Sequence, residues 1–220
     1  LVNALGIEEF AHQVEAEWAR IDHQAVDLPV AEFERIAAAF APRALPPRPA
    51  SDGVLAHRRA TDAAFARFYR NNTSAHRASG YRIATIALKE PGRIPGDASA
   101  AQMEIIAGLA QRYSSDEARV TYTQNIVLPH VAVADLPALF DELVAAGLAS
   151  ANQGLISDLI ACPGLDYCNL ANARSIPIAQ EIARRFAEPG RAEAIGPLRL
   201  NISGCINACG HHHVGHIGIL

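Results

Sequence analysis

Residues 161–168, ACPGLDYC, and residues 201–210, NISGCINACG, contain all four cysteines of this chain. The first pair has the spacing C-x5-C and the second has the spacing C-x3-C. Disulfides are disfavoured because nothing in the sequence indicates an oxidising compartment, and unrelated buried cysteines would be scattered along the chain. The clustering therefore predicts one metal site held by four thiolates.

Zinc and an iron–sulfur cluster both accept four thiolate ligands. Structural zinc usually takes short spacings, whereas a cluster is larger than one ion and accepts ligands from wider loops. Residues beside the cysteines let the backbone approach a bulky group and offer N–H groups to its sulfides. They are Pro163, Gly164, Gly204 and Gly210. The spacing favours a [4Fe-4S] cluster and leaves zinc as the alternative.

Length and composition limit the class of protein. The chain has 220 residues, 50% of them hydrophobic, and suits one large domain or two small ones. Its formal net charge of −4 argues against nucleic-acid binding. No apolar run approaches the roughly 20 residues that a membrane span needs, and residues 1–10 lack the flanks of a signal peptide. We therefore expect a cytoplasmic protein without nucleic-acid or membrane partners.

The first part of the chain has a helical pattern that ends in a proline-rich stretch. Apolar residues recur at helical spacing within residues 7–18 and 33–40, which predicts two amphipathic helices. Residues 42–53, PRALPPRPASDG, contain four prolines and predict a linker. A short helix is expected at residues 60–70. We place a helical segment with its linker at residues 1–53.

Strand and helix patterns alternate in the next part of the chain. YRIATIAL at residues 81–88 predicts a strand, and residues 120–128 predict a second one. Ser99 and Gln102 form a capping box ahead of a helix that runs to Tyr113. These elements belong to a compact α/β unit, which we place at residues 54–150.

A further helix closes this unit. Asp135 is expected to cap it, with Pro137 in its first turn and Gly147 as its stop. Beyond it, residues 154–162, GLISDLIAC, predict a strand that runs into Cys162.

Strand and helix also alternate around the second cysteine pair. Residues 175–186 predict a helix, and residues 198–202 alternate as a strand that leads towards Cys205. Both cysteine pairs therefore follow the ends of strands, where two loops can converge. We place this last domain at residues 151–220.

The motifs resemble a known family. ACPGLDYCNLANARSIPIAQEIA at residues 161–183, followed by NISGCINACGHHHVGHIGIL at residues 201–220, resembles the sirohaem and [4Fe-4S] motif of the nitrite and sulfite reductase haemoproteins. RVTYTQNIVLPHV at residues 119–131 is similar to a strand of that family's second ferredoxin-like half domain. The resemblance covers about residues 70–220. It implies a ferredoxin-like half domain followed by a mixed α/β sirohaem and [4Fe-4S] domain, so that with the N-terminal helices predicted from apolar spacing the chain has an α+β fold.

The resemblance also implies a set of site residues. Cys162, Cys168, Cys205 and Cys209 would hold the cluster, and Cys209 would also bridge to the sirohaem iron. Three polar residues match family positions that contact the tetrapyrrole or its carboxylates, namely Gln124, Asn125 and Asn207. Arg119 is a further candidate for cofactor binding, with an exposed charge at a strand edge as its alternative role.

The implied reaction is the six-electron reduction of a small anion. Sulfite, reduced to sulfide, is our first choice, and nitrite, reduced to ammonia, is the alternative. The electron donor would be ferredoxin or a flavoprotein. A cluster-bearing relative without sirohaem, such as precorrin-3B synthase, is the remaining alternative, together with a purely structural cluster or zinc domain.

The basic residues that would bind the substrate are not found in this sequence. The chain has one lysine, begins with Leu1 and ends at Leu220 inside an alternating apolar pattern. We expect it to be the carboxyl-side piece of a longer, truncated enzyme, inactive alone, with its catalytic residues upstream.

Histidines provide a separate candidate for metal binding. In a strand, His211 and His213 would share one face and His212 and His216 the other, which favours polar packing over a common metal site. Two isolated histidines, His76 and His130, are expected to be structural or solvated.

Overall fold

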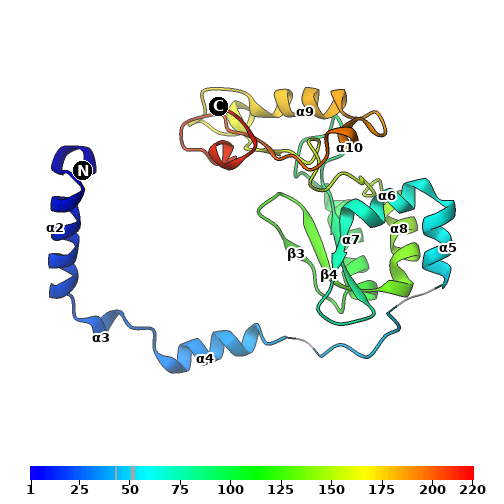
Figure 1. Cartoon of the computed structure of the whole chain (residues 1–220), viewed down its shortest axis with the longest axis horizontal. Helices are drawn as coiled ribbons and strands as arrows, with labels where there is room; N and C mark the ends of the chain where they lie inside the picture. Colours follow the sequence, from blue (N-terminus) through cyan, green and yellow to red (C-terminus); the bar gives the residue numbers. More distant parts are fainter. Residues whose placement is uncertain (43, 51–52) are drawn as a thin grey trace. The chain divides into compact units, whose positions relative to one another are not determined.

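The computed structural model describes residues 1–42, 44–50 and 53–220, and the chain forms two compact units (Figure 1). The first unit is Leu1–Leu45 and the second is Pro46–Leu220. Arg43, Ser51 and Asp52 of the predicted linker lie outside the described residues. Within the described ranges, no helix combines the length and the apolarity needed to cross a membrane.

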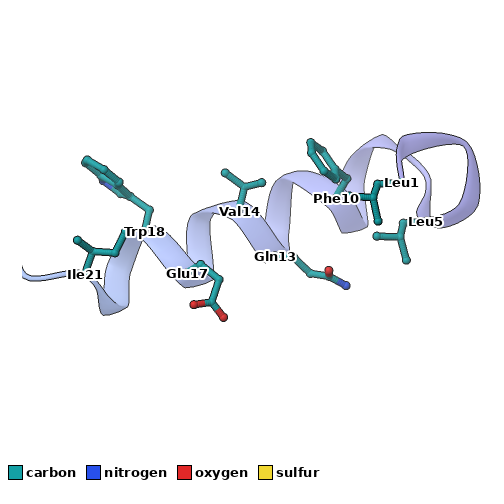
Figure 2. A pocket seen from close by; sticks show the side chains of 8 residues that line it. All are labelled: Leu1, Leu5, Phe10, Gln13, Val14, Glu17, Trp18 and Ile21. Carbon is teal, nitrogen blue, oxygen red and sulfur yellow. The ribbon is translucent and has the colours of Figure 1, made fainter.

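The first unit consists of helices whose apolar faces remain exposed. Both predicted amphipathic helices are confirmed, as α2 and α4, and neither contains a buried residue. Phe10, Val14 and Trp18 project from α2 (Figure 2). The helices of this unit are α1 (Val2–Leu5), α2 (Ile7–Arg20), α3 (His23–Val26) and α4 (Val30–Ala39).

The second unit begins with an antiparallel sheet covered by helices. The strand order is β1-β2-β4-β3, and Phe65, Phe68, Leu109, Leu128 and Leu139 in the core between sheet and helices are fully buried. The strands are β1 (Thr73–Ala75), β2 (Tyr81–Ile86), β3 (Arg119–Val120) and β4 (Ile126–Ala132). The helices are α5 (Gly53–Thr61), α6 (Ala63–Asn72), α7 (Ala100–Tyr113) and α8 (Leu136–Ala145).

Helix ends in this sheet domain partly follow the predictions. The capping box of Ser99 and Gln102 at the start of α7 is confirmed, with both of its hydrogen bonds present. Asp135 is the N-cap of α8, but its side chain makes no capping hydrogen bond, so that part of the prediction is wrong. The single helix expected at residues 60–70 is two helices, because Asp62 caps a new helix by accepting a hydrogen bond from Phe65 N–H.

The strand predicted at residues 120–128 is a hairpin. β3 and β4 pair antiparallel, with Val120 opposite Ile126, and residues 121–125 form the turn between them. Gln124 has a φ of +59°, a left-handed conformation that a continuous strand does not contain. Thr121 Oγ1 accepts a hydrogen bond from Asn125 N–H at 3.1 Å and stabilises the turn.

The cysteines lie on loops beside a second, parallel sheet. Its order is β5-β6-β7, formed by β5 (Ile160–Ala161), β6 (Leu200–Ile202) and β7 (Ile217–Ile219), with α9 (Ser175–Arg185) and α10 (Arg191–Ile195) in the same part of the chain. The strand expected at residues 154–162 is only two residues long, because residues 153–158 form turns and bends, in which Gly154 has a φ of +76°. The predicted α+β architecture, with N-terminal helices ahead of an antiparallel sheet domain and a mixed α/β domain, is confirmed.

Candidate functional site

Cys162 and Cys205 follow neighbouring parallel strands. Ile160 pairs with Asn201 and Ala161 with Ile202, so the carboxyl ends of β5 and β6 lie side by side. Cys162 comes directly after β5 and Cys205 three residues after β6. The prediction that both cysteine pairs follow strand ends is confirmed, and both of these thiols are buried.

The two cysteine loops pack backbone against backbone. Gly204 accepts hydrogen bonds at its carbonyl from Asn172 N–H at 2.7 Å and Ala173 N–H at 3.1 Å. A Cβ atom at Gly204 would lie 2.9 Å from Gly164 Cα, so a side chain there would separate the loops. The glycines expected to admit a bulky group therefore bring the two cysteine-bearing loops into direct contact.

The sulfur of Cys162 already accepts a backbone hydrogen bond. Gly204 N–H donates to Cys162 Sγ at 3.0 Å, from the loop that carries the second cysteine pair. Ser175, in the first turn of α9, donates its hydroxyl hydrogen bond to the Cys162 carbonyl and lies 3.5 Å from the sulfur. N–H groups directed at a sulfur stabilise the thiolate form that binds metal.

The other two cysteines are more accessible. Cys168 is half-buried in the loop after β5, where its N–H donates to Gly164 O at 2.9 Å. Cys209 is exposed and follows Ala208, whose φ of +56° turns the chain sharply. Among residues 1–42, 44–50 and 53–220, no three side chains of His, Cys, Asp or Glu are close enough to hold a single metal ion as they stand.

The amide side chain of Gln124 is hydrogen-bonded to the strand before Cys162. Its Nε2 donates to Ala161 O at 2.8 Å, and its Oε1 accepts from Ala161 N–H at 3.2 Å. Asn125 is fully buried, where its Oδ1 accepts from Leu88 N–H and its Nδ2 donates to Asp158 at 2.9 Å. Both residues, predicted to contact a tetrapyrrole, join the half domain to the cysteine domain.

Arg119 and Asn207 lie at the surface. Arg119, on β3, forms an ion pair with Glu117 at 2.5 Å and is largely exposed. Asn207, between Cys205 and Cys209, is also exposed. Large apolar side chains on the same cysteine loops are exposed too: Tyr167 by 74%, Leu170 by 72% and Ile206 by 83%. Such a surface is typical of one that another group covers.

Sequence reasoning missed Lys89 and Asp158. Lys89 Nζ lies 3.6 Å from Asp158 Oδ1, with exposed side-chain fractions of 1% and 5%. Burial lowers the pKa of Lys89 and raises the pKa of Asp158, and the attraction between the two opposes both shifts. The one available signal was that the only lysine of the chain directly follows the strand predicted at residues 81–88.

Within the described ranges, the histidines of residues 211–216 do not come together as a metal site. His212–Val214 is a short 3-10 helix, so the strand on which their alternation was argued begins only at Ile217. His76 and His130, expected to be isolated, are hydrogen-bonded to each other at 3.2 Å between Nε2 and Nδ1. His130 Nε2 lies 3.2 Å from Glu117 Oε2, which continues the network across the sheet.

Residues 85–146 match the family model of the nitrite/sulfite reductase ferredoxin-like half domain, which spans most of the sheet domain described above. This part of the chain is similar to the nitrite and sulfite reductases. The chain is 37% identical over 131 residues to a ferredoxin–nitrite reductase from Zea mays, an alignment that covers 57% of this chain and 22% of the relative. A sulfite reductase [ferredoxin] 2 from Mycolicibacterium paratuberculosis is 32% identical, in an alignment that covers 57% of this chain and 23% of the relative.

A solved structure agrees with the fold. The NirA protein of Mycobacterium tuberculosis aligns with a TM-score of 0.52 and 27% identity, over 64% of this chain and 25% of that one. The chain therefore spans about a quarter or less of the length of these three proteins. The matched region supports the predicted ferredoxin-like half domain and the resemblance to this family.

Proposed function

We propose that this chain holds the cluster-binding part of a reductase that acts on a small oxyanion. The observation that carries the proposal is the position of Cys162 and Cys205 after adjacent parallel strands, on loops packed together at Gly204. Four cysteines on two such loops suit a [4Fe-4S] cluster, because a cube takes ligands farther apart than one ion does. The wide C-x5-C spacing makes zinc, which usually takes shorter spacings, the poorer fit.

Cys162, Cys168, Cys205 and Cys209 would hold the cluster, and the exposed Cys209 thiol would also reach the sirohaem iron. Asn207 and Arg119 are accessible to a tetrapyrrole, and Tyr167, Leu170 and Ile206 offer it apolar contacts. When bound, the coupled cluster and haem would supply stored electrons beside an iron that takes the oxyanion. The chain's own part is to hold, shield and orient these groups.

Gln124 and Asn125 have a different part in this proposal. Their amides are bonded inside the protein, so they fix the turn that faces the cysteine domain and contact the tetrapyrrole less directly than expected. Catalytic cations would then come from residues outside this chain. We expect the chain alone to reduce neither anion at a rate near that of its full-length relatives.

Sulfite, reduced to sulfide, is the proposed substrate. Nitrite, reduced to ammonia, is the second candidate, and the identity to the Zea mays ferredoxin–nitrite reductase supports it. The names of both ferredoxin-dependent relatives support ferredoxin as the electron donor. Titration of each anion into the loaded chain, followed by the haem absorption spectrum, measures which of the two binds more tightly.

Anaerobic reconstitution tests the cluster. The chain incubated with ferrous iron, sulfide and sirohaem should retain about four cluster irons and an equal amount of acid-labile sulfide. Cys162→Ser, Cys168→Ser, Cys205→Ser and Cys209→Ser should each lose most of this iron, whereas Tyr167→Phe, on the same loop, should keep it. Binding of stoichiometric zinc without iron would overturn the proposal, and a cluster without sirohaem would favour the synthase-like alternative.

A further inference from the structure

Lys89 joins three segments of the second unit. It follows β2, and its ammonium donates to the carbonyl oxygens of Thr123 and Leu159, each at 2.8 Å. Thr123 lies in the turn between β3 and β4, and Leu159 directly precedes β5. One buried cation therefore binds the half domain to the strand that leads into Cys162.

The surrounding polar groups form one connected set, which we call the Lys89 cluster: Lys89, Asn125, Asn152 and Asp158. Asp158 accepts from Asn125 Nδ2 at 2.9 Å and, at its other oxygen, from Gly154 N–H at 2.9 Å. Asn152 Nδ2 donates to the Lys89 carbonyl at 3.0 Å. Each member of the Lys89 cluster therefore makes a hydrogen bond across the junction between the half domain and the cysteine domain.

Filling a core with charged groups costs free energy, because the charges are removed from water. A buried ion pair is often no more stabilising than apolar side chains of the same volume, but its hydrogen bonds fix one geometry. Here the fixed geometry concerns the turn at residues 121–125 and residues 158–161. Gln124, in that turn, bonds to Ala161, the residue before Cys162.

We propose that Lys89 is a positioning residue that holds the turn at residues 121–125 against residues 158–161 and thereby fixes Cys162 relative to the half domain. The ammonium binds a carbonyl on each side of the junction, and Gln124 can reach Ala161 only when the two sides stay together. The consequence for a bound cluster rests on the proposed function. The positioning itself is a property of the protein and is measurable without any cofactor.

Hydrogen exchange followed by NMR tests this role in the chain without cofactors. In Lys89→Met, the Ala161 N–H, which donates to Gln124, should exchange at least about tenfold faster, while the amides of Leu139 and Leu143 in α8 keep their rates. Alkylation of the buried Cys162 thiol should accelerate in parallel. Arg93→Met, an exposed cation on the loop after Lys89, is the matched control and should change neither.

A double variant keeps the test valid if Lys89→Met does not fold. Lys89→Met leaves Asp158 buried without its partner, so Lys89→Met/Asp158→Asn removes both charges and should retain the fold with the same local exchange at Ala161. Unchanged exchange at Ala161, an equal increase throughout α8, or unfolding of both variants would each overturn the positioning role.

A second arm separates this inference from the proposed function. If the wild-type chain binds a cluster, Lys89→Met should keep its iron content and shift the reduction potential, whereas Arg93→Met should leave the potential unchanged. An unshifted potential would overturn the consequence for the cluster. If the wild-type chain binds no iron, the proposed function fails, and the exchange at Ala161 still decides the role of Lys89.

Discussion

The Gln124 side chain and the Ala161 backbone exchange two hydrogen bonds, at 2.8 and 3.2 Å, in the way that neighbouring strands do. Gln124 belongs to the half domain and Ala161 to the parallel sheet, one residue before Cys162. The left-handed backbone of Gln124 directs its amide to this partner. The Gln124 side chain, in the turn between β3 and β4, thus pairs with β5 as the backbone of a neighbouring strand would.

Gln124→Glu tests that pairing with little change in volume. The carboxylate can accept from Ala161 N–H but cannot donate to Ala161 O, so we expect the free energy of unfolding to fall by about 1–3 kcal/mol. Urea denaturation measures the change. Gln111→Glu, on the exposed face of α7, is the control and should change stability by less than about 0.5 kcal/mol. Equal stability of both variants would show that the pairing contributes nothing.

Gly96→Ala tests the contact that holds Gln124 from the other side. A Cβ at Gly96 would lie 2.7 Å from Gln124 Cβ, and the residue has a φ of +79°. We expect a loss of about 1–2 kcal/mol from the left-handed backbone and a further 1–3 kcal/mol or so from the collision. Gly154→Ala, with a φ of +76° and open space around it, carries the first cost alone. Thermal unfolding of both variants separates the two costs.

The elements that could be predicted from the sequence are those whose signals lie within a few residues of one another. The Ser99 and Gln102 capping box and the apolar spacing of α2 and α4 depend on neighbours within one or two turns, and these predictions are confirmed. The hairpin at residues 119–132 was missed because Val120 and residues 126–128 read as one apolar strand. What divides them is the left-handed conformation of Gln124, which no local apolar pattern predicts.

The positions of Cys162 and Cys205 could be predicted because they depend on such local signals. Cysteine spacing and the strand ends placed Cys162 and Cys205 near one edge, as the pairing of β5 and β6 bears out. The partners of Asn125 were not predictable, because Leu88 and Asp158 lie 37 and 33 residues away in the sequence. The buried pair of Lys89 and Asp158 was missed on the same ground, since their separation spans two domains.

Ser175→Ala tests the support beneath Cys162. The Ser175 side chain is almost fully buried and donates to the Cys162 carbonyl, so its removal leaves that oxygen without this partner. We expect a loss of about 1–3 kcal/mol in the free energy of unfolding and faster alkylation of Cys162. Ser74→Ala, on the exposed side of β1, is the control. An unchanged rate of Cys162 alkylation in Ser175→Ala would show that Ser175 does not support the cysteine site.

The histidine network on the sheet predicts a dependence of stability on pH. Ala78 N–H donates to His76 Nδ1 at 2.8 Å, so the proton of neutral His76 is on Nε2 and points at His130 Nδ1. His130 then carries its proton on Nε2 and donates to Glu117. Burial lowers the pKa of His130, although Glu117 opposes the shift, and the nearby His76 and Arg119 add to it.

The sign of the pH effect follows from this lowered pKa. The unfolded chain takes up the His130 proton near pH 6.5, whereas the folded chain takes it up only at a lower pH. The stabilisation from neutral His130 is therefore complete above about pH 6.5 and is lost as the pH falls from there through the folded pKa, at no more than about 1.4 kcal/mol per pH unit. Urea denaturation between pH 7.5 and 5.5 or so should give a flatter dependence for His130→Gln than for the wild type. His57→Gln, an exposed imidazole on α5, is the matched control, and an equally steep dependence in His130→Gln would show that the network does not carry the effect.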